Sequence, residues 1–284
     1  MIRLAAAIIV FIAPLLAHAQ ALDGALKKIR DTKAVTLAYR TDARPFSFSD
    51  EKGQPAGYTV DLCKAVVASL EQQLKLQGIK VNWVAATSQN RIELVAKKQV
   101  DMECGATTAT LSRMEQVDFS SFVFIDGTGL LVRIDSGVKS VGDLGGKRVG
   151  AIPGTTNETA LRDTLKTRLV SATVVPVKNR EEAMAALEAD KIDAFASDKL
   201  LILGIQANVK DPNRYGVLQD YLSIEPLAIV LPRGDAPLRL AVNRALSQIY
   251  RSPAIVESFG RWFGVLGKPS GLLEAMYLFG AIPE

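Results

Sequence analysis

A loop of small and hydroxyl-bearing residues, ECGATTATLSRMEQVDFS, runs from Glu103 to Ser120. It holds a Gly-Ala pair, two adjacent threonines and one arginine, Arg113. Hydroxyls, backbone N–H groups and a guanidinium are all donors, and charge-assisted bonds to a guanidinium are stronger than neutral ones. The segment therefore predicts an anion-binding loop. The alternative for Arg113 is a surface ion pair with Glu115 or Asp118.

A second stretch, PGTT with Thr155 and Thr156, is expected to open a helix. A helix N-terminus favours negative charge. The stretch lacks the lysine of a P-loop, so it does not predict nucleotide binding. Thr156 is the expected contact with an anion, and simple N-capping by Thr155 or Thr156 is the alternative.

The first nineteen residues are typical of a secretory signal peptide. Arg3 precedes an apolar stretch from Leu4 to Leu16, and Ala17-His18-Ala19 is a small-residue cleavage site. The stretch is shorter than the roughly 20 residues that span a bilayer, although a membrane anchor is the alternative. Gln20 follows the cleavage site where a lipoprotein would have cysteine. We therefore expect residues 1–19 to be removed and the protein to be periplasmic.

Cleavage would remove His18, the only histidine in the chain. This excludes Ser-His-Asp and Cys-His catalysis, histidine-bearing zinc sites and the commonest general base. Cys63 and Cys104 are too few for a cysteine-only metal site, so we expect neither a metal nor a cofactor. In an exported protein an even count favours a disulfide, with two buried thiols as the alternative. The net charge of +4 is spread along the chain, which argues against nucleic-acid binding.

Alternation of strand-like and helix-like segments predicts an α/β fold. Ligands of open α/β sheets gather where strands end, and a cleft between two such halves favours a small-molecule site. Two extended segments, 127–136 and 225–235, are candidate hinge strands, so that C-terminal helices would complete the first half. The predicted strands are 34–39, 79–86, 100–104, 147–152, 172–177 and 191–198, and the predicted helices are 60–74, 90–98, one following PGTT, 179–189, 238–250 and 254–264.

The order and spacing of several motifs resemble the type II periplasmic amino-acid-binding proteins of ABC transporters, known as solute-binding protein family 3. The motifs are RPFSFSDEKGQPAGYTVDLCKAV, TSQNRIELVAKKQVDMECGATT, SRMEQVDFSSFVF, VGDLGGKRVGAIPGTT and FGRWFG. TSQNRI and ECGATT are most similar to the glutamate/aspartate-binding branch. The resemblance implies a two-lobe type II fold with two hinge strands. Lobe 1 would comprise residues 20–128 and 229–284, and lobe 2 residues 129–228.

The resemblance also implies roles for residues that hold the main-chain groups of an amino acid. Arg113 and Thr108 match positions that bind the α-carboxylate, and Asp198 matches the acidic residue that binds the ammonium group. A helix N-cap or turn is the alternative for Asp198. Thr156 would add a hydroxyl from the second lobe.

The side-chain subsite predicts an anionic ligand. Arg40 stands where relatives that bind cationic amino acids carry an acid, and Ser88 stands where they carry an aromatic residue. Arg91 adds a second guanidinium, and a buried carboxylate requires a paired cation. Solvated surface arginines are the alternative for Arg40 and Arg91.

Two positions depart from the acidic-amino-acid branch. Ala106 replaces a common serine, and Arg180 replaces a histidine near the distal end of the ligand. Arg180 could therefore shorten the pocket in favour of aspartate, or point to solvent.

The sequence thus predicts a monomeric receptor that delivers an acidic amino acid to an inner-membrane permease, without catalysis. One alternative is an exported enzyme similar to cyclohexadienyl or arogenate dehydratase. Without histidine it would need a carboxyl group of raised pKa, and no acidic pair is apparent in the cleft motifs. A ligand sensor that contacts a chemoreceptor or kinase is the other alternative.

Overall fold

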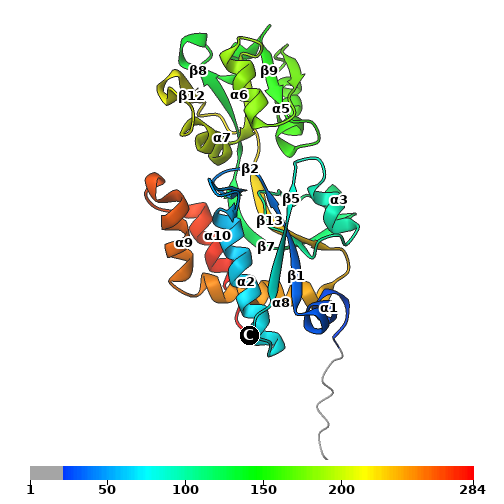
Figure 1. Cartoon of the computed structure of the whole chain (residues 1–284). Helices are drawn as coiled ribbons and strands as arrows, with labels where there is room; N and C mark the ends of the chain where they lie inside the picture. Colours follow the sequence, from blue (N-terminus) through cyan, green and yellow to red (C-terminus); the bar gives the residue numbers. More distant parts are fainter. Residues whose placement is uncertain (1–21) are drawn as a thin grey trace, which may run out of the picture.

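Two five-stranded sheets, each packed between helices, organise residues 22–284, the part of the chain that the computed structural model describes (Figure 1). The predicted signal peptide at 1–19 lies outside the described residues. Within residues 22–284, none of the helices combines the length and the apolar character needed to cross a bilayer. The two sheets form the cores of two lobes, which Figure 1 shows one above the other.

The first sheet has the strand order β5-β1-β6-β13-β7. β1 runs parallel to β5 and β6, whereas β13 runs antiparallel to β6 and β7. Its strands are β1 (Ala34–Arg40), β5 (Lys80–Ala86), β6 (Met102–Glu103), β7 (Val117–Asp126) and β13 (Glu225–Pro232). Its helices are α1 (Gly24–Thr32), α2 (Tyr58–Leu74), α3 (Arg91–Ala96), α4 (Leu111–Met114), α8 (Ala236–Tyr250), α9 (Ala254–Phe263) and α10 (Gly271–Gly280).

Alternation along the strands gives this sheet two apolar faces. In β13, Leu227, Ile229 and Leu231 pack with α2, α8, α9 and α10, and Ala228 and Val230 face the side covered by α3. On the larger face, Phe46, Tyr58, Phe124 and Phe263 stack in edge-to-face and tilted pairs. Such pairs add stability beyond the burial of their area.

The second sheet has the order β10-β9-β11-β8-β12. In β8, Leu130 and Val132 pack with α5, while Leu131 packs with α6 and α7 on the other face. Its strands are β8 (Thr128–Arg133), β9 (Arg148–Ala151), β10 (Thr173–Pro176), β11 (Ala194–Asp198) and β12 (Tyr215–Val217). Its helices are α5 (Thr156–Thr167), α6 (Arg180–Glu188) and α7 (Lys199–Gln206).

The chain passes from the first sheet to the second at Gly127, between β7 and β8. It returns between β12 and β13, and β13 pairs with β7 through residues 225–232. The C-terminal helices α8, α9 and α10 pack against the first sheet, as the sequence predicts. The exact division into lobes at 128/129 and 228/229 stays a prediction.

Most predicted elements are present, and several are shorter than predicted. The strand expected over 100–104 is reduced to Met102–Glu103, and the helix expected through Lys98 ends at Ala96. The segment 41–57, for which the sequence predicts neither a helix nor a strand, contains a small antiparallel sheet of β2 (Asp42–Ala43), β3 (Ser47–Ser49) and β4 (Pro55–Ala56). Its strands are two or three residues long, too short for a periodic pattern.

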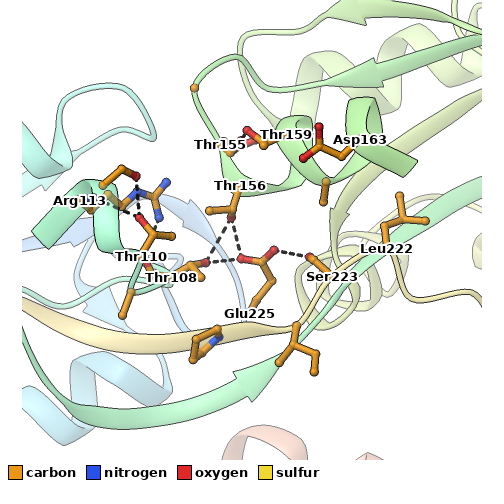
Figure 2. A pocket seen from close by; sticks show the side chains of 16 residues that line it. Thr108, Thr110, Arg113, Thr155, Thr156, Thr159, Asp163, Leu222, Ser223 and Glu225 are labelled. Atoms are coloured by element: carbon orange, nitrogen blue, oxygen red, sulfur yellow. Dashed lines mark hydrogen bonds between the residues drawn. The ribbon is translucent and has the colours of Figure 1, made fainter. Parts of the chain in front are cut away.

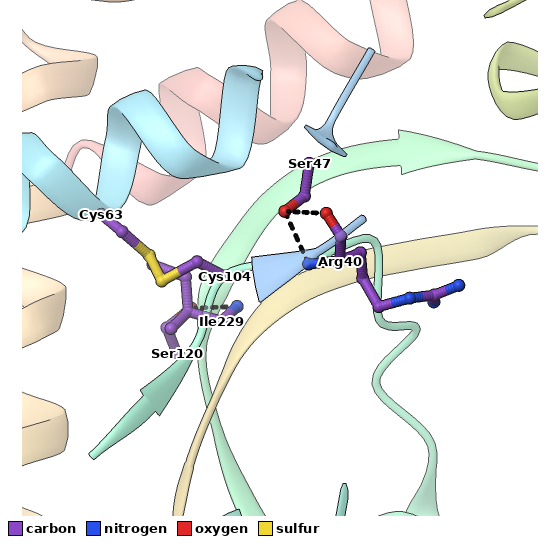
Figure 3. Close-up of a disulfide and its surroundings, with 6 residues drawn as sticks. All are labelled: Arg40, Ser47, Cys63, Cys104, Ser120 and Ile229. Atoms are coloured by element: carbon purple, nitrogen blue, oxygen red, sulfur yellow. Dashed lines mark hydrogen bonds between the residues drawn. A yellow bond between two sulfur atoms is a disulfide. The ribbon is translucent and has the colours of Figure 1, made fainter. Parts of the chain in front are cut away.

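The predicted disulfide between Cys63 and Cys104 is confirmed. It joins α2 to the residue that follows β6, across a sequence separation of 41 residues (Figure 3). The Cys104 N–H donates to the Ala38 carbonyl, so the bridge also holds the strand that ends at Arg40. The disulfide therefore ties the first-lobe helix layer to the strand ends where the site lies.

Candidate functional site

A cavity of about 600 Å³ lies between the two lobes. Its lining includes three of the predicted site residues: Thr108 and Arg113 from the first lobe, and Thr156 from the second. Segment 222–226, which leads into β13, forms a third side. Figure 2 shows the side chains of Thr108 and Thr156 converging from opposite lobes on one carboxylate, that of Glu225.

Glu225 is fully buried and receives hydroxyl groups from both lobes. Thr108 Oγ1 donates to Glu225 Oε2 at 2.5 Å, and Thr156 Oγ1 donates to the same oxygen at 2.7 Å. Thr128 and Ser223 donate to Oε1. The sequence interpretation missed Glu225. The sign in the sequence is only that an acidic residue begins an otherwise apolar strand.

Thr155, not Thr156, is the N-cap of α5, because its hydroxyl accepts the Glu158 N–H. Thr156 is thereby left to face the other lobe.

Arg113 lies in the short helix α4, which Thr110 caps. Its Nη1 donates to the Thr108 carbonyl at 2.7 Å. No ion pair joins Arg113 to Glu115 or Asp118 anywhere in residues 22–284, so the surface ion-pair alternative is wrong. Burial lowers the pKa of Arg113, and the nearby Glu225, Glu103 and Asp198 act against that shift.

Arg40 ends β1 and is only 1% exposed, so it is not a solvated surface arginine. Its Nη2 donates to Asp42 Oδ1 at 2.6 Å and to Ser88 Oγ at 2.8 Å. Ser47 Oγ accepts the Arg40 backbone N–H and fixes this strand end (Figure 3). The Nε of Arg40 has no hydrogen-bond partner within the described part of the chain.

Arg91 begins α3 and is likewise buried, so the surface alternative is wrong for it too. Its Nη1 donates to the Ser88 carbonyl at 2.8 Å. Burial, with repulsion from Arg40 and Arg113, lowers the pKa of Arg91 to about 9. Glu103, one of the groups that oppose this shift, is fully buried, and neither of its carboxylate oxygens has a hydrogen-bond partner among residues 22–284.

Arg180 reaches from α6 of the second lobe to the first, so it does not point to solvent. Its Nη1 donates to Asp42 Oδ2 at 3.1 Å, and the residue is 5% exposed. Burial raises the pKa of Asp42, but Arg180 and Arg40 together outweigh burial and bring it below its ordinary value. Asp42 was not among the predicted site residues, because an acid two residues after Arg40 in an expected loop carried no distinguishing signal.

Asp198 ends β11 and occupies the N-cap position of α7, but its side chain makes no capping hydrogen bond. Its Oδ1 is buried without a partner in the described structure. Burial and the proximity of Glu225 raise its pKa. Asp126, at the end of β7, has a raised pKa because it is buried near Asp198. Asp126 and Asp198 thus form an acidic pair near the site. The sequence interpretation found no such pair, because it could not foresee that these two strand ends meet.

Ala106 is the one predicted site residue that brings no polar group. It is 7% exposed and packs with the apolar core of the first lobe. The other eight fall into two groups and one residue between them. Around Glu225 lie Thr108, Arg113 and Thr156, and around Asp42 lie Arg40, Ser88, Arg91 and Arg180. Asp198 lies between the two groups. Asp198 influences Arg113 and Arg180 electrostatically, which places it near both groups.

The arrangement as a whole can hold anions and one cation. Arg91 and Arg113 form no salt bridge within residues 22–284, whereas Arg40 and Arg180 share Asp42. Two guanidiniums without a carboxylate partner are suited to two carboxylates, and Asp198 is suited to an ammonium group. No cluster of three potential metal ligands occurs in the described residues.

Comparison with known sequences identifies a family for most of the chain. Residues 35–265 match the profile of the bacterial extracellular solute-binding proteins, family 3. The L-glutamate/L-aspartate-binding protein of Pseudomonas aeruginosa is 35% identical over 255 residues, which cover 89% of this chain and 84% of that protein. The glutamate/aspartate import solute-binding protein of Salmonella typhimurium is 30% identical and covers 87% of this chain and 83% of its own length.

Solved structures agree with the two-lobe architecture. An ancestral amino acid-binding protein, AncCDT-1, described as a precursor of cyclohexadienyl dehydratase, superposes with a TM-score of 0.74 at 27% identity. It covers 84% of this chain, and all of that chain is matched. An ancestral arginine-binding protein bound to glutamine gives a TM-score of 0.72 at 26% identity, covering 82% of this chain and 98% of its own. The α/β fold of type II binding proteins is therefore confirmed.

Proposed function

Because the chain belongs to the bacterial extracellular solute-binding proteins, family 3, we propose that it captures glutamate or aspartate between its lobes. In this proposal the closed form then delivers the amino acid to the inner-membrane permease of an ABC transporter. The protein acts in the periplasm as a monomer, after removal of residues 1–19. The relatives named as glutamate/aspartate-binding proteins support the choice of ligand.

The observation that carries the proposal is a pair of arginines that form no salt bridge within residues 22–284, Arg91, which is buried, and Arg113, which is half-buried. Burying a charge is costly unless it is paired, so Arg91 and Arg113 favour a ligand that brings two carboxylates. Arg113 binds the α-carboxylate, and the hydroxyls of Thr108 and Thr156 donate to it when they turn away from Glu225. Arg91, with Arg40 and Ser88, binds the side-chain carboxylate.

Asp198 binds the ammonium group of the ligand. Its Oδ1 has no partner within residues 22–284, and a bound ammonium would supply the missing donors. Arg180 contributes positive charge at the distal end from the second lobe, so ligand contacts come from both lobes. Such a ligand stabilises the closed arrangement in which the lobes meet.

Catalysis is not part of the proposal, although Asp126 and Asp198 are an acidic pair. Both carboxylate oxygens of Asp126 accept backbone N–H groups, from Gly127 at 2.8 Å and from Leu200 at 3.0 Å. Asp126 therefore serves to join β7 to the start of α7, and Asp198 is required for the ammonium. Incubation with prephenate or arogenate is expected to produce no aromatic absorbance.

A thermal-shift panel of the twenty amino acids and the simple dicarboxylates tests the proposed function. A ligand at 100 times its dissociation constant adds about 2.7 kcal/mol to the free energy of unfolding. We expect glutamate or aspartate to give the largest shift, and dicarboxylates without an amino group to give a smaller one because they leave Asp198 unpaired. A shift for lysine or phenylalanine without one for glutamate or aspartate would contradict the proposal.

A further inference from the structure

Asp42 occupies a singular position among the charged groups of the site. It accepts from Arg40 of its own lobe at 2.6 Å and from Arg180 of the other lobe at 3.1 Å. The Asp42 side chain is 18% exposed, and those of the two arginines are 2% and 6% exposed. These three side chains, here called the Asp42 trio, carry a net charge of +1.

Charge counting shows why the trio matters for the ligand. Without Asp42, the cluster of Arg40, Arg91 and Arg180 would hold three buried positive charges, opposed within the protein by Glu103 near Arg40 and Arg91 and by Asp198 near Arg180. Asp42 neutralises one of them and directs an Nη group of both arginines toward itself. Charges in such a water-poor site interact strongly, because solvent screens them little.

The trio also bridges the lobes, which raises the question whether it acts only on closure. Asp42 and Arg180 line a second interlobe cavity of about 460 Å³, on the Arg44 and α7 side. A bridge between lobes would stabilise closure around any ligand. An effect on closure alone would therefore change the affinities for charged and neutral ligands by the same factor.

We infer that Asp42 is a specificity-determining residue that sets how strongly the site prefers an acidic amino acid over its amide. This inference rests on the proposed function. By holding Arg40 and Arg180, Asp42 lowers the positive potential at the side-chain carboxylate and limits the preference for an acid. Removing Asp42 raises that preference, and removing Arg180 lowers it.

The test is the ratio of affinities for an acid and its amide, glutamate over glutamine and aspartate over asparagine, measured by isothermal titration. Asp42→Asn should raise the ratio about tenfold or more, and Arg180→Gln should lower it by a similar factor. The double variant restores the net charge of the trio, so its ratio should return to within about threefold of the wild-type value. Glu181→Gln is the matched control, because it removes an exposed carboxylate beside Arg180 and should leave the ratio unchanged.

Two results overturn the inference. An Asp42→Asn protein with the wild-type ratio means that Asp42 acts on closure alone. A double variant that keeps the low ratio of Arg180→Gln means that Arg180 acts by direct contact and not through the charge of the trio. If Asp42→Asn does not fold, as judged by circular dichroism, Arg180→Lys decides in its place: it keeps the charge of the trio and should keep the wild-type ratio, and a ratio as low as that of Arg180→Gln overturns the inference. A wild-type protein that binds neither acid overturns the proposed function itself, which distinguishes the two failures.

Discussion

Thr156 in the second lobe donates a 2.7 Å hydrogen bond to the carboxylate of Glu225, at the start of the strand that returns to the first lobe (Figure 2). Thr108 of the first lobe donates to the same oxygen at 2.5 Å. One buried carboxylate therefore joins hydroxyls from both lobes. The same two hydroxyls are the ones assigned to the α-carboxylate of the ligand. Because each hydroxyl has one hydrogen to donate, Glu225 and the ligand compete for these donors.

Replacing Glu225 by glutamine should lower the free energy of unfolding by about 1–3 kcal/mol. The amide retains one acceptor oxygen and presents an N–H₂ group to hydroxyls that donate to the carboxylate. Thermal and urea unfolding measure the change. Asp163→Asn is the control, because Asp163 lines the same cavity and its side chain makes no hydrogen bond within residues 22–284. Equal stability of both variants would contradict this view of Glu225.

Affinity for the amino acid should fall as the pH is lowered. Burial and the proximity of Glu225 raise the pKa of Asp198 above its ordinary value, so Asp198 takes up a proton at a higher pH than a free aspartate. The protonated form cannot pair with an ammonium group, so the loss should begin well above the ordinary aspartate pKa of about 3.9. Titrations from neutral to mildly acidic pH measure it.

Asp198→Asn is the matched variant for the pH series. It should bind weakly throughout, and its affinity should lack the acidic-side decline of the wild type. The stability of the fold should depend on pH in the opposite direction. Because the carboxyl pKa is raised, the folded state binds more protons than the unfolded state, so the contribution of Asp198 to the free energy of unfolding is lost as the pH rises through the raised pKa. Parallel pH profiles for the two proteins would remove Asp198 from the ligand site.

Gly204→Ala should weaken ligand binding without contacting the ligand. A Cβ on Gly204 in α7 would overlap the carbonyl oxygen of Arg44 in the first lobe, which is backbone and cannot rotate away. The closed arrangement would have to open slightly. Gly260→Ala in α9 is the matched control, since a Cβ there meets no atom within 4 Å. Equal affinities for the two variants would show that α7 does not approach this loop in the bound form.

Removing the disulfide should reduce stability and leave ligand selectivity intact. The bridge closes a segment with a sequence separation of 41, and loss of a cross-link of this kind costs about 2–4 kcal/mol. Cys63→Ala/Cys104→Ala should therefore unfold at a lower temperature than the wild type. Reductant should shift the wild-type melting temperature toward that of the double variant. A wild type unaffected by complete reduction would contradict this role.

The sequence interpretation succeeded where a signal is local and failed where it depends on which strand ends meet. The helix predicted over 60–74 corresponds to α2, and the predicted disulfide is present. The composition of its loop singled out Arg113, the family resemblance singled out Arg40 and Asp198, and their contacts with a ligand stay a prediction. Glu225 and Asp126 could not be assigned, because their significance depends on contacts between segments far apart in the chain. Asp42 could not be assigned for the same reason, since its partner Arg180 lies 138 residues away.

Isothermal titration of glutamate and aspartate against the wild type, Arg113→Ala and the exposed control Arg162→Ala tests the central claim most directly. The account predicts that the wild type and Arg162→Ala bind with equal affinity. It predicts a loss of about 3–5 kcal/mol for Arg113→Ala, because a buried carboxylate loses its partner. An Arg113→Ala protein that binds as tightly as the wild type, or a wild type that binds neither acid, would contradict the account.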